Sequence, residues 1–207
     1  MRANHGFSKL LVDDEAPRLS PEGKHFLARV LKASQSMGEI IDDLLAYARV
    51  EREVAEVGSI DLALLCRAIV EARADEVVPG AIELRADFPP VRVRATHGGL
   101  TLALRNLLDN AVKFSHMAKP PRIDIGASIE GDFCTVWIRD NGIGFDMAYH
   151  DKIFEIFQRL HRADEYSGTG IGLAIVRKAM QRMGGQVWAQ SAPGQGATFY
   201  LQLPVMR

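Results

Sequence analysis

The sequence has 207 residues, of which 47% are hydrophobic and 25% are charged, the proportions of an ordinary globular protein. The formal net charge of -1 excludes the basic surface that attracts nucleic acid or an anionic membrane, so we expect no nucleic-acid partner. Cys66 and Cys134 form no Cys-x-x-Cys pair, which predicts buried thiols in a reducing compartment. No apolar run approaches the roughly 20 residues of a membrane span. We therefore expect a cytoplasmic chain, whether the full-length protein is soluble or membrane-anchored.

Residues 1–52 carry helical signals. Ser20 and Pro21 supply an N-cap and a proline at the first helical position. Beyond them, apolar residues recur at alternating steps of four and three in two neighbouring stripes. The first stripe consists of Phe26, Val30, Ala33, Met37, Ile40, Leu44 and Tyr47. With a shorter helical segment before Ser20, this pattern predicts a helical hairpin that pairs with a second copy as a dimeric four-helix bundle. The alternative is one amphipathic helix packed on its own domain.

The repeat stops in the charged residues 51–58, which predicts a domain boundary there and a second domain over residues 59–207. In this second part, 3.6-residue periodicity predicts helices over residues 60–74, 99–115 and 171–183. Alternating residues predict strands near residues 82–86, 91–95, 123–129, 134–140, 186–189 and 197–203. Strands with helices between them predict an α+β fold, a two-layer α/β sandwich with helices on one face of a sheet.

One polar stripe interrupts the apolar helix expected over residues 99–115. Asn106, Asn110 and Lys113 fall at i, i+4 and i+7, so they share a helix face. Asparagine is a poor helix former, and two at this spacing call for a reason. Amide oxygens suit Mg²⁺ and a lysine suits a phosphate, so the stripe is a candidate metal and phosphate site. A solvated helix face is the alternative.

Two glycine clusters frame a polar insert over residues 158–167. The second cluster, residues 168–173, opens a helix whose free amides and positive dipole end favour a phosphate. The first follows Asp140, which ends a strand on its core-facing side. A carboxylate there needs donors such as the amine of adenine, and a plain Asp-Asn-Gly turn is the alternative. Thr198 is a further candidate for the base, or simply a strand former. The clusters predict a nucleotide site with a lid.

These motifs together resemble those of the sensor histidine kinases. The segment Asn106 to Phe114 resembles their N box, and Asp140-x-Gly142-x-Gly144 resembles their G1 box. The remaining matches are Phe154-x-x-Phe157 to the F box, Gly168-Thr-Gly-Ile-Gly172-Leu to the G2 box, and Gly194-x-Gly196-Ala-Thr198-Phe to the G3 box. The heptad hairpin resembles their dimerisation and phosphotransfer domain, most of all that of phytochrome- and PAS-linked kinases.

The resemblance implies a Bergerat-type (GHKL) domain that binds ATP with Mg²⁺. It assigns the metal to Asn110, the phosphates to Lys113 and the amides of residues 170–173, and the adenine to Asp140. Asn106 stands where ATPase relatives carry a water-activating glutamate, so hydrolysis should be slow and the γ-phosphoryl group kept for a side chain. Asn106 and Lys113 are therefore the expected catalytic residues. The expected nucleotide-binding residues are Asn106, Asn110, Lys113, Asp140, Gly142, Gly144, Phe157, Arg159, Gly168, Thr169, Gly170, Ile171, Gly172, Leu173 and Thr198.

The family's phosphoacceptor lies in a His-Glu/Asp-x-Arg-x-Pro motif, at a position that here falls before Met1. His5 and His25 lack the acid and the proline, so we expect that this fragment cannot autophosphorylate. The resemblance implies a homodimeric kinase that passes phosphate to a histidine and then to a response-regulator receiver domain, under an upstream PAS or phytochrome-like sensor domain. The alternatives are an acceptor-less ATP-binding dimerisation module and a GHKL serine kinase of the anti-sigma type. The long heptad hairpin tells against the serine kinase.

Overall fold

The computed structural model describes residues 19–52, 56–74, 82–161, 166 and 168–206. The first helix of the expected hairpin lies outside the described residues. The elements in chain order are α2 (Pro21–Arg52), β1 (Gly58–Asp61), α3 (Leu62–Ala74), β2 (Glu83–Asp87), β3 (Arg92–Ala95), α4 (His97–Ser115), β4 (Arg122–Glu130), β5 (Phe133–Asp140), the 3-10 helices η2 (Met147–Tyr149) and η3 (Lys152–Phe154), α5 (Gly172–Arg182), β6 (Gln186–Ser191) and β7 (Ala197–Pro204).

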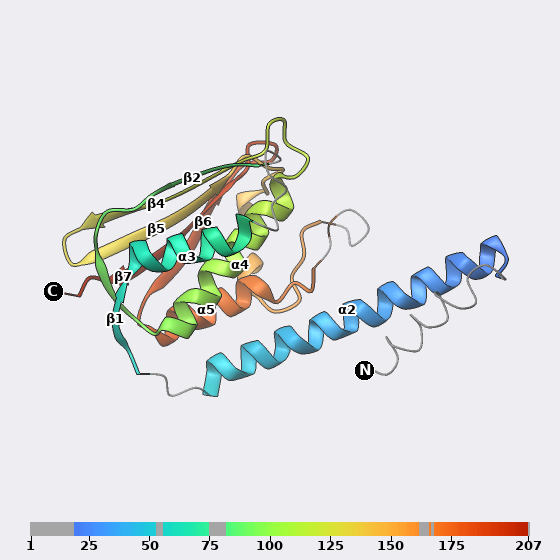
Figure 1. Cartoon of the computed structure of the whole chain (residues 1–207), viewed down its shortest axis with the longest axis horizontal. Helices are drawn as coiled ribbons and strands as arrows, with labels where there is room; N and C mark the ends of the chain where they lie inside the picture. The colour runs from blue at the N-terminus through green and yellow to red at the C-terminus, as the bar shows by residue number, and fades with distance from the viewer. Residues whose placement is uncertain (1–18, 53–55, 75–81, 162–165, 167, 207) are drawn as a thin grey trace.

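Helix α2 is long, and much of its apolar surface is exposed. Its start is the one predicted from the sequence: Pro21 is the first helical residue, and the hydroxyl of Ser20 accepts a hydrogen bond from the amide of Gly23 at 3.1 Å. None of its 32 residues is buried. The helix extends well past the α/β domain at its N-terminal end and runs beside α5 nearer its C-terminal end (Figure 1). The domain boundary predicted after Arg52 stays a prediction.

The five-stranded sheet has the strand order β2-β4-β5-β7-β6, in which β2 pairs parallel with β4 and the other pairs are antiparallel. Helices α3, α4 and α5 lie on one face of this sheet (Figure 1). The two-layer α/β sandwich predicted from the sequence is therefore confirmed. The predicted single sheet was incomplete, because β1 and β3 form a separate antiparallel pair.

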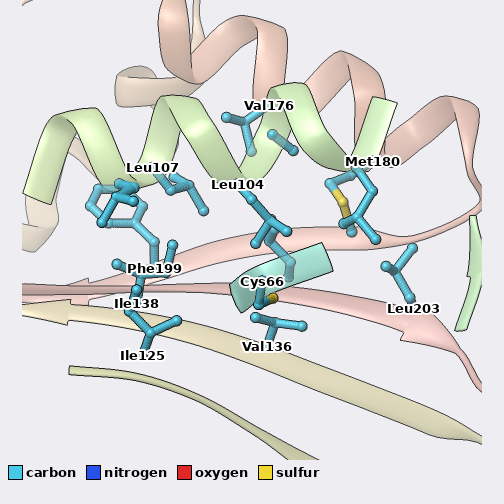
Figure 2. Packing of buried hydrophobic residues seen from close by; sticks show 14 of the residues in the cluster. Cys66, Leu104, Leu107, Ile125, Val136, Ile138, Val176, Met180, Phe199 and Leu203 are labelled. Atoms are coloured by element: carbon cyan, nitrogen blue, oxygen red, sulfur yellow. The ribbon is translucent and has the colours of Figure 1, made fainter. Parts of the chain in front are cut away.

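The core lies between the sheet and the helices. Along each strand, every second side chain points toward the helices and so belongs to the core. Val136, Ile138 and Leu203 point from the sheet toward Leu104 of α4 and Met180 of α5 (Figure 2), and all five are at most 2% exposed. The opposite face of the sheet carries Trp188 and Tyr200, whose stacked rings lie 5.1 Å apart. The two-residue period thus divides the strand residues between the core and the open face.

Both cysteines are free and buried, as the sequence predicts. Burial raises the pKa of Cys66 to about 12 and that of Cys134 to about 11, so both thiols are protonated near neutral pH. Among the described helices, none is both long enough and apolar enough to span a bilayer.

Asp140 is the polar exception in this core. It ends β5 in register with Val136 and Ile138, and only 5% of its surface is exposed. Burial raises the pKa of its carboxyl to about 6, and the hydrogen bond that the Gly142 amide donates at 2.8 Å offsets this only in part. The ionised carboxylate therefore lowers the stability of the folded state at neutral pH.

Replacement of Asp140 by asparagine is expected to stabilise the fold at neutral pH. The folded state holds the Asp140 proton more tightly than the unfolded chain does, so this residue's contribution to stability is lost as the pH rises from about 4 through about 6. The asparagine retains an acceptor for Gly142 but carries no charge. We expect Asp140→Asn to gain up to about 3 kcal/mol at neutral pH, with the gain shrinking toward pH 4, in denaturant titrations. Asp87→Asn, at the exposed end of β2, serves as the control for the same change of side chain, and a pH-independent loss of stability in Asp140→Asn would contradict this account.

Candidate functional site

A cavity of about 520 Å³ opens between α4, α5 and the segment that joins η3 to α5. It contains most of the residues that the sequence singled out. Those that line it are Asn106, Asn110, Lys113, Asp140, Gly144, Arg159, Gly168, Thr169, Gly170, Gly172 and Leu173. The structure thus brings the polar stripe of α4 and both glycine clusters to one place.

Helix α4 carries the polar stripe along one wall of the cavity. The hydroxyl of Thr96 caps the helix by accepting a hydrogen bond from the amide of Gly99 at 3.2 Å. The amide nitrogen of Asn106 donates to the carbonyl of Leu102 at 2.8 Å, which fixes the side chain. Its oxygen faces α5 so closely that a Cβ on Gly172 would lie 2.7 Å from it. A Cβ at this position would therefore displace the Asn106 amide from its place beside α5.

The turn after β5 holds Asp140 against the end of α4. The amide of Ile143 donates to the carbonyl of Phe114 at 3.3 Å. A Cβ on Gly142 would lie 2.2 Å from that carbonyl oxygen, and one on Gly196 would lie 2.0 Å from the carbonyl oxygen of Asp140. These backbone contacts explain the glycines of the first cluster, because no side chain fits there. Gly142 itself does not line the cavity, but it orients the Asp140 carboxylate that does.

Apolar side chains surround Asp140 on the cavity wall. Phe145, Ile153, Leu173 and Phe199 line the same cavity, and Phe145 and Phe199 lie with their ring centroids 6.2 Å apart. An apolar wall with one buried acceptor suits a flat heterocycle that carries an amine donor.

Lys113 supplies positive charge at the cavity. Burial lowers the pKa of its ammonium group, and the nearby Arg159 guanidinium lowers it further. Both cations line the cavity, so an anionic ligand would relieve their mutual repulsion. Gly168, at φ 132°, leaves room for this charge, because a Cβ there would lie 3.0 Å from the Lys113 nitrogen.

The second glycine cluster presents backbone amides at the start of α5. Ile171 occupies the N-cap position, and no side chain caps the helix. The first amides of α5 are therefore available to an anion. Gly170, at φ 75°, accepts a hydrogen bond from the Phe157 amide at 2.9 Å, which ties the two ends of the connecting segment together. Ile171 is fully buried and acts through its backbone alone.

Besides Gly142 and Ile171, two expected site residues do not line the cavity. Phe157 is 57% exposed and adopts φ 65°, and its backbone amide donates to the carbonyl of Gly170 in the glycine cluster. Thr198 pairs with Arg139 in the sheet register, and its hydroxyl accepts a hydrogen bond from the Arg139 guanidinium at 3.2 Å. Since Asp140 points to the opposite face, the structure does not bring Thr198 to it. Ala197 and Phe199 line the cavity instead.

Several cavity residues lie outside the set that we expected to bind the nucleotide. Three acids of α2 line it, namely Glu39, Asp42 and Asp43. Phe114, His161 and Tyr166 also line it and contact one another, with the rings of Phe114 and Tyr166 5.2 Å apart. The α2 acids lie more than sixty residues before the rest of the site, so no local pattern links them to it.

The amide side chains fit a Mg²⁺ ion that arrives with a phosphate ligand. Among the described residues, no group of three or more histidine, cysteine or acidic side chains is arranged to hold a metal ion. Magnesium needs no such group, since it keeps several waters and takes one or two protein oxygens together with phosphate oxygens. Asn106 and Asn110 provide amide oxygens on the cavity wall.

Comparison with known proteins identifies the family. The family of histidine kinase-, DNA gyrase B-, and HSP90-like ATPases matches residues 96–207. Similar proteins include phytochrome-like protein Cph1 of Synechocystis sp., 34% identical over 199 residues, and cyanobacterial phytochrome A of Nostoc sp., 37% identical over 190 residues. These alignments cover 96% and 91% of this chain but 26% and 24% of the two relatives. The chain thus spans about a quarter of the length of these relatives.

The solved structures agree with this match. Full-length ShkA in complex with AMPPNP has a TM-score of 0.71 and 26% sequence identity, over 98% of this chain and 42% of ShkA. The family match, the two-layer sandwich and these relatives show that the chain belongs to the histidine kinase-, DNA gyrase B-, and HSP90-like ATPases, as the catalytic core of a sensor histidine kinase.

Proposed function

We propose that this chain binds Mg²⁺·ATP in the cavity between α4 and α5 and donates the γ-phosphoryl group to a histidine, from which a response-regulator aspartate receives it. The observation that carries the proposal is the convergence in one cavity of a buried carboxylate, two amide side chains, two cations and an uncapped helix N-terminus. The presence of AMPPNP, an ATP analogue, in the similar ShkA structure supports nucleotide binding.

Each part of the cavity has one task in this proposal. The Asp140 carboxylate accepts a hydrogen bond from the adenine amine, and the apolar wall beside it covers the base. Lys113, Arg159 and the amides at the start of α5 bind the phosphates. Asn110 holds Mg²⁺, which neutralises charge on the phosphate oxygens. The buried charge of Asp140 and the half-buried charge of Lys113 are costly without a ligand, so ligand binding offsets part of that cost.

Asn106 favours transfer over hydrolysis. Its amide nitrogen is held by the carbonyl of Leu102, and its oxygen lies beside Gly172 at the start of α5. A neutral amide cannot accept a proton from water, so Asn106 positions the phosphates but does not activate a water molecule. The γ-phosphoryl group is thereby kept for a side-chain acceptor.

Loss of the Asn110 amide should remove the contribution of magnesium to binding. We expect calorimetry with AMPPNP to show that Mg²⁺ tightens binding to the parent protein, and that this gain falls by about tenfold or more in Asn110→Ala. In EDTA the two proteins should bind alike, which serves as the control for folding. Unchanged Mg²⁺-dependent affinity in Asn110→Ala would contradict the assignment of the metal to this residue.

The acceptor histidine is proposed to lie outside this chain. Neither His5 nor His25 is followed by the acid and proline of the family's acceptor motif. We expect the purified chain, incubated with γ-labelled ATP, to acquire no acid-labile, base-stable label. The appearance of such a label on this chain would show that it contains its own acceptor. The similarity to phytochromes supports an upstream sensor domain of the PAS or phytochrome-like type in the whole protein.

The exposed stripe of α2 supports homodimerisation. Phe26, Val30 and Leu45 are 63%, 54% and 50% exposed, although the heptad pattern makes them interface residues. Charges on this stripe should separate the dimer. We expect sedimentation to give a dimer for the parent chain and a monomer for the double variant Phe26→Glu/Val30→Glu. Leu64→Glu, at an equally exposed position on α3, should remain dimeric, and a monomeric parent at micromolar concentration would contradict the proposal.

A further inference from the structure

Helix α2 forms one wall of the nucleotide cavity as well as carrying the exposed stripe. It runs beside α5 (Figure 1), and three of its acids, Glu39, Asp42 and Asp43, line the cavity. The contact between α2 and α5 extends beyond the cavity, toward the C-terminal end of α2. There Glu51 forms an ion pair with Lys178 at 2.9 Å, and Lys178 lies 6.0 Å from the ring of Tyr47.

At the cavity, α2 is bonded to the phosphate loop itself. The hydroxyl of Thr169 donates a hydrogen bond to the carboxylate of Asp43. The same hydroxyl oxygen accepts a hydrogen bond from the amide of Ile171 at 3.3 Å. Asp43 therefore holds the glycine cluster whose amides are offered to the phosphates, and it places a negative charge beside them.

Charge makes this wall unfavourable for a triphosphate. Among the described residues that line the cavity, the lysine and arginine side chains are Lys113 and Arg159, and α2 sets three carboxylates against them. A carboxylate near a phosphate at low dielectric is strongly repulsive. The other walls also carry two acids, Asp109 and Asp140, but they combine them with amides and with both of these cations.

We propose that the docked position of α2 competes with nucleotide binding: Asp43 holds the phosphate loop and the acidic wall repels the triphosphate, so nucleotide and docked helix each weaken the other. This inference rests on the proposed nucleotide site. By linkage, the factor by which docking lowers nucleotide affinity equals the factor by which nucleotide weakens docking. Because α2 also carries the stripe that we propose as the dimer interface, nucleotide binding in the cavity would change the position of that stripe relative to the ATP-binding domain.

The test compares two variants of the full chain that change opposite ends of the contact between α2 and the ATP-binding domain. Asp43→Asn removes charge in the cavity while its side-chain oxygen still accepts from Thr169. Glu51→Gln weakens the ion pair with Lys178, and neither of these two residues lines the cavity. Glu71→Gln, an exposed acid on α3, removes the same charge elsewhere and is the matched control.

We expect calorimetry with Mg²⁺·AMPPNP to show binding about fivefold or more tighter in Asp43→Asn and about twofold tighter in Glu51→Gln. Glu71→Gln should bind as the parent does. Weaker binding in Asp43→Asn would overturn the proposal by showing that Asp43 assists the ligand. A gain in Asp43→Asn with none in Glu51→Gln would also overturn it, because the effect would then be local charge and not docking.

The same titrations separate this inference from the function on which it rests. Nucleotide binding by the parent, with no gain in either variant, would overturn the competition and leave the proposed ATP site intact. Binding by none of the four proteins would overturn both. Binding by the two variants alone would support both, since docking would then mask the site in the parent.

Discussion

The turn after β5 is the constraint on which the rest of the site depends. It passes so close to the end of α4 and to the turn before β7 that no Cβ fits at Gly142 or Gly196. This close packing buries Asp140 at the end of β5, where the Gly142 amide of the turn donates a hydrogen bond to its carboxylate. The glycines are therefore required by backbone contacts within the fold, and the ligand site is a consequence of those contacts.

The groups that suit this cavity to a nucleotide also lower the stability of the folded protein. Burial raises the pKa of Asp140 and lowers that of Lys113, so each group resists carrying the charge that its task requires. An apolar pair would stabilise the fold better, but it would provide neither an acceptor for a base nor a cation for a phosphate. The uncapped amides at the start of α5 show the same conflict. A side-chain cap would stabilise the helix, but it would occupy the amides that an anion needs.

Helix α2 connects the two halves of the proposed mechanism through its two faces. One face carries exposed apolar residues suited to a second copy of the chain, and the other carries acids that contact the phosphate loop. A long helix is a stiff element, so a change at Asp43 is transmitted along its length. The geometry therefore gives the nucleotide site and the dimer interface one element in common.

The sequence by itself determined the local features: the capped start of α2, the alternation of the strands, the shared face of Asn106 and Lys113, and the buried register of Asp140. Each follows from a period of 2 or 3.6 residues or from local turn chemistry. Tertiary structure alone decided that β2 pairs with β4 and β3 with β1, that Thr198 faces Arg139, and that Asp43 reaches Thr169. These contacts join segments that are far apart in the chain. Periodicity predicts which face of a helix or strand a residue occupies, but it does not predict which other element packs against that face.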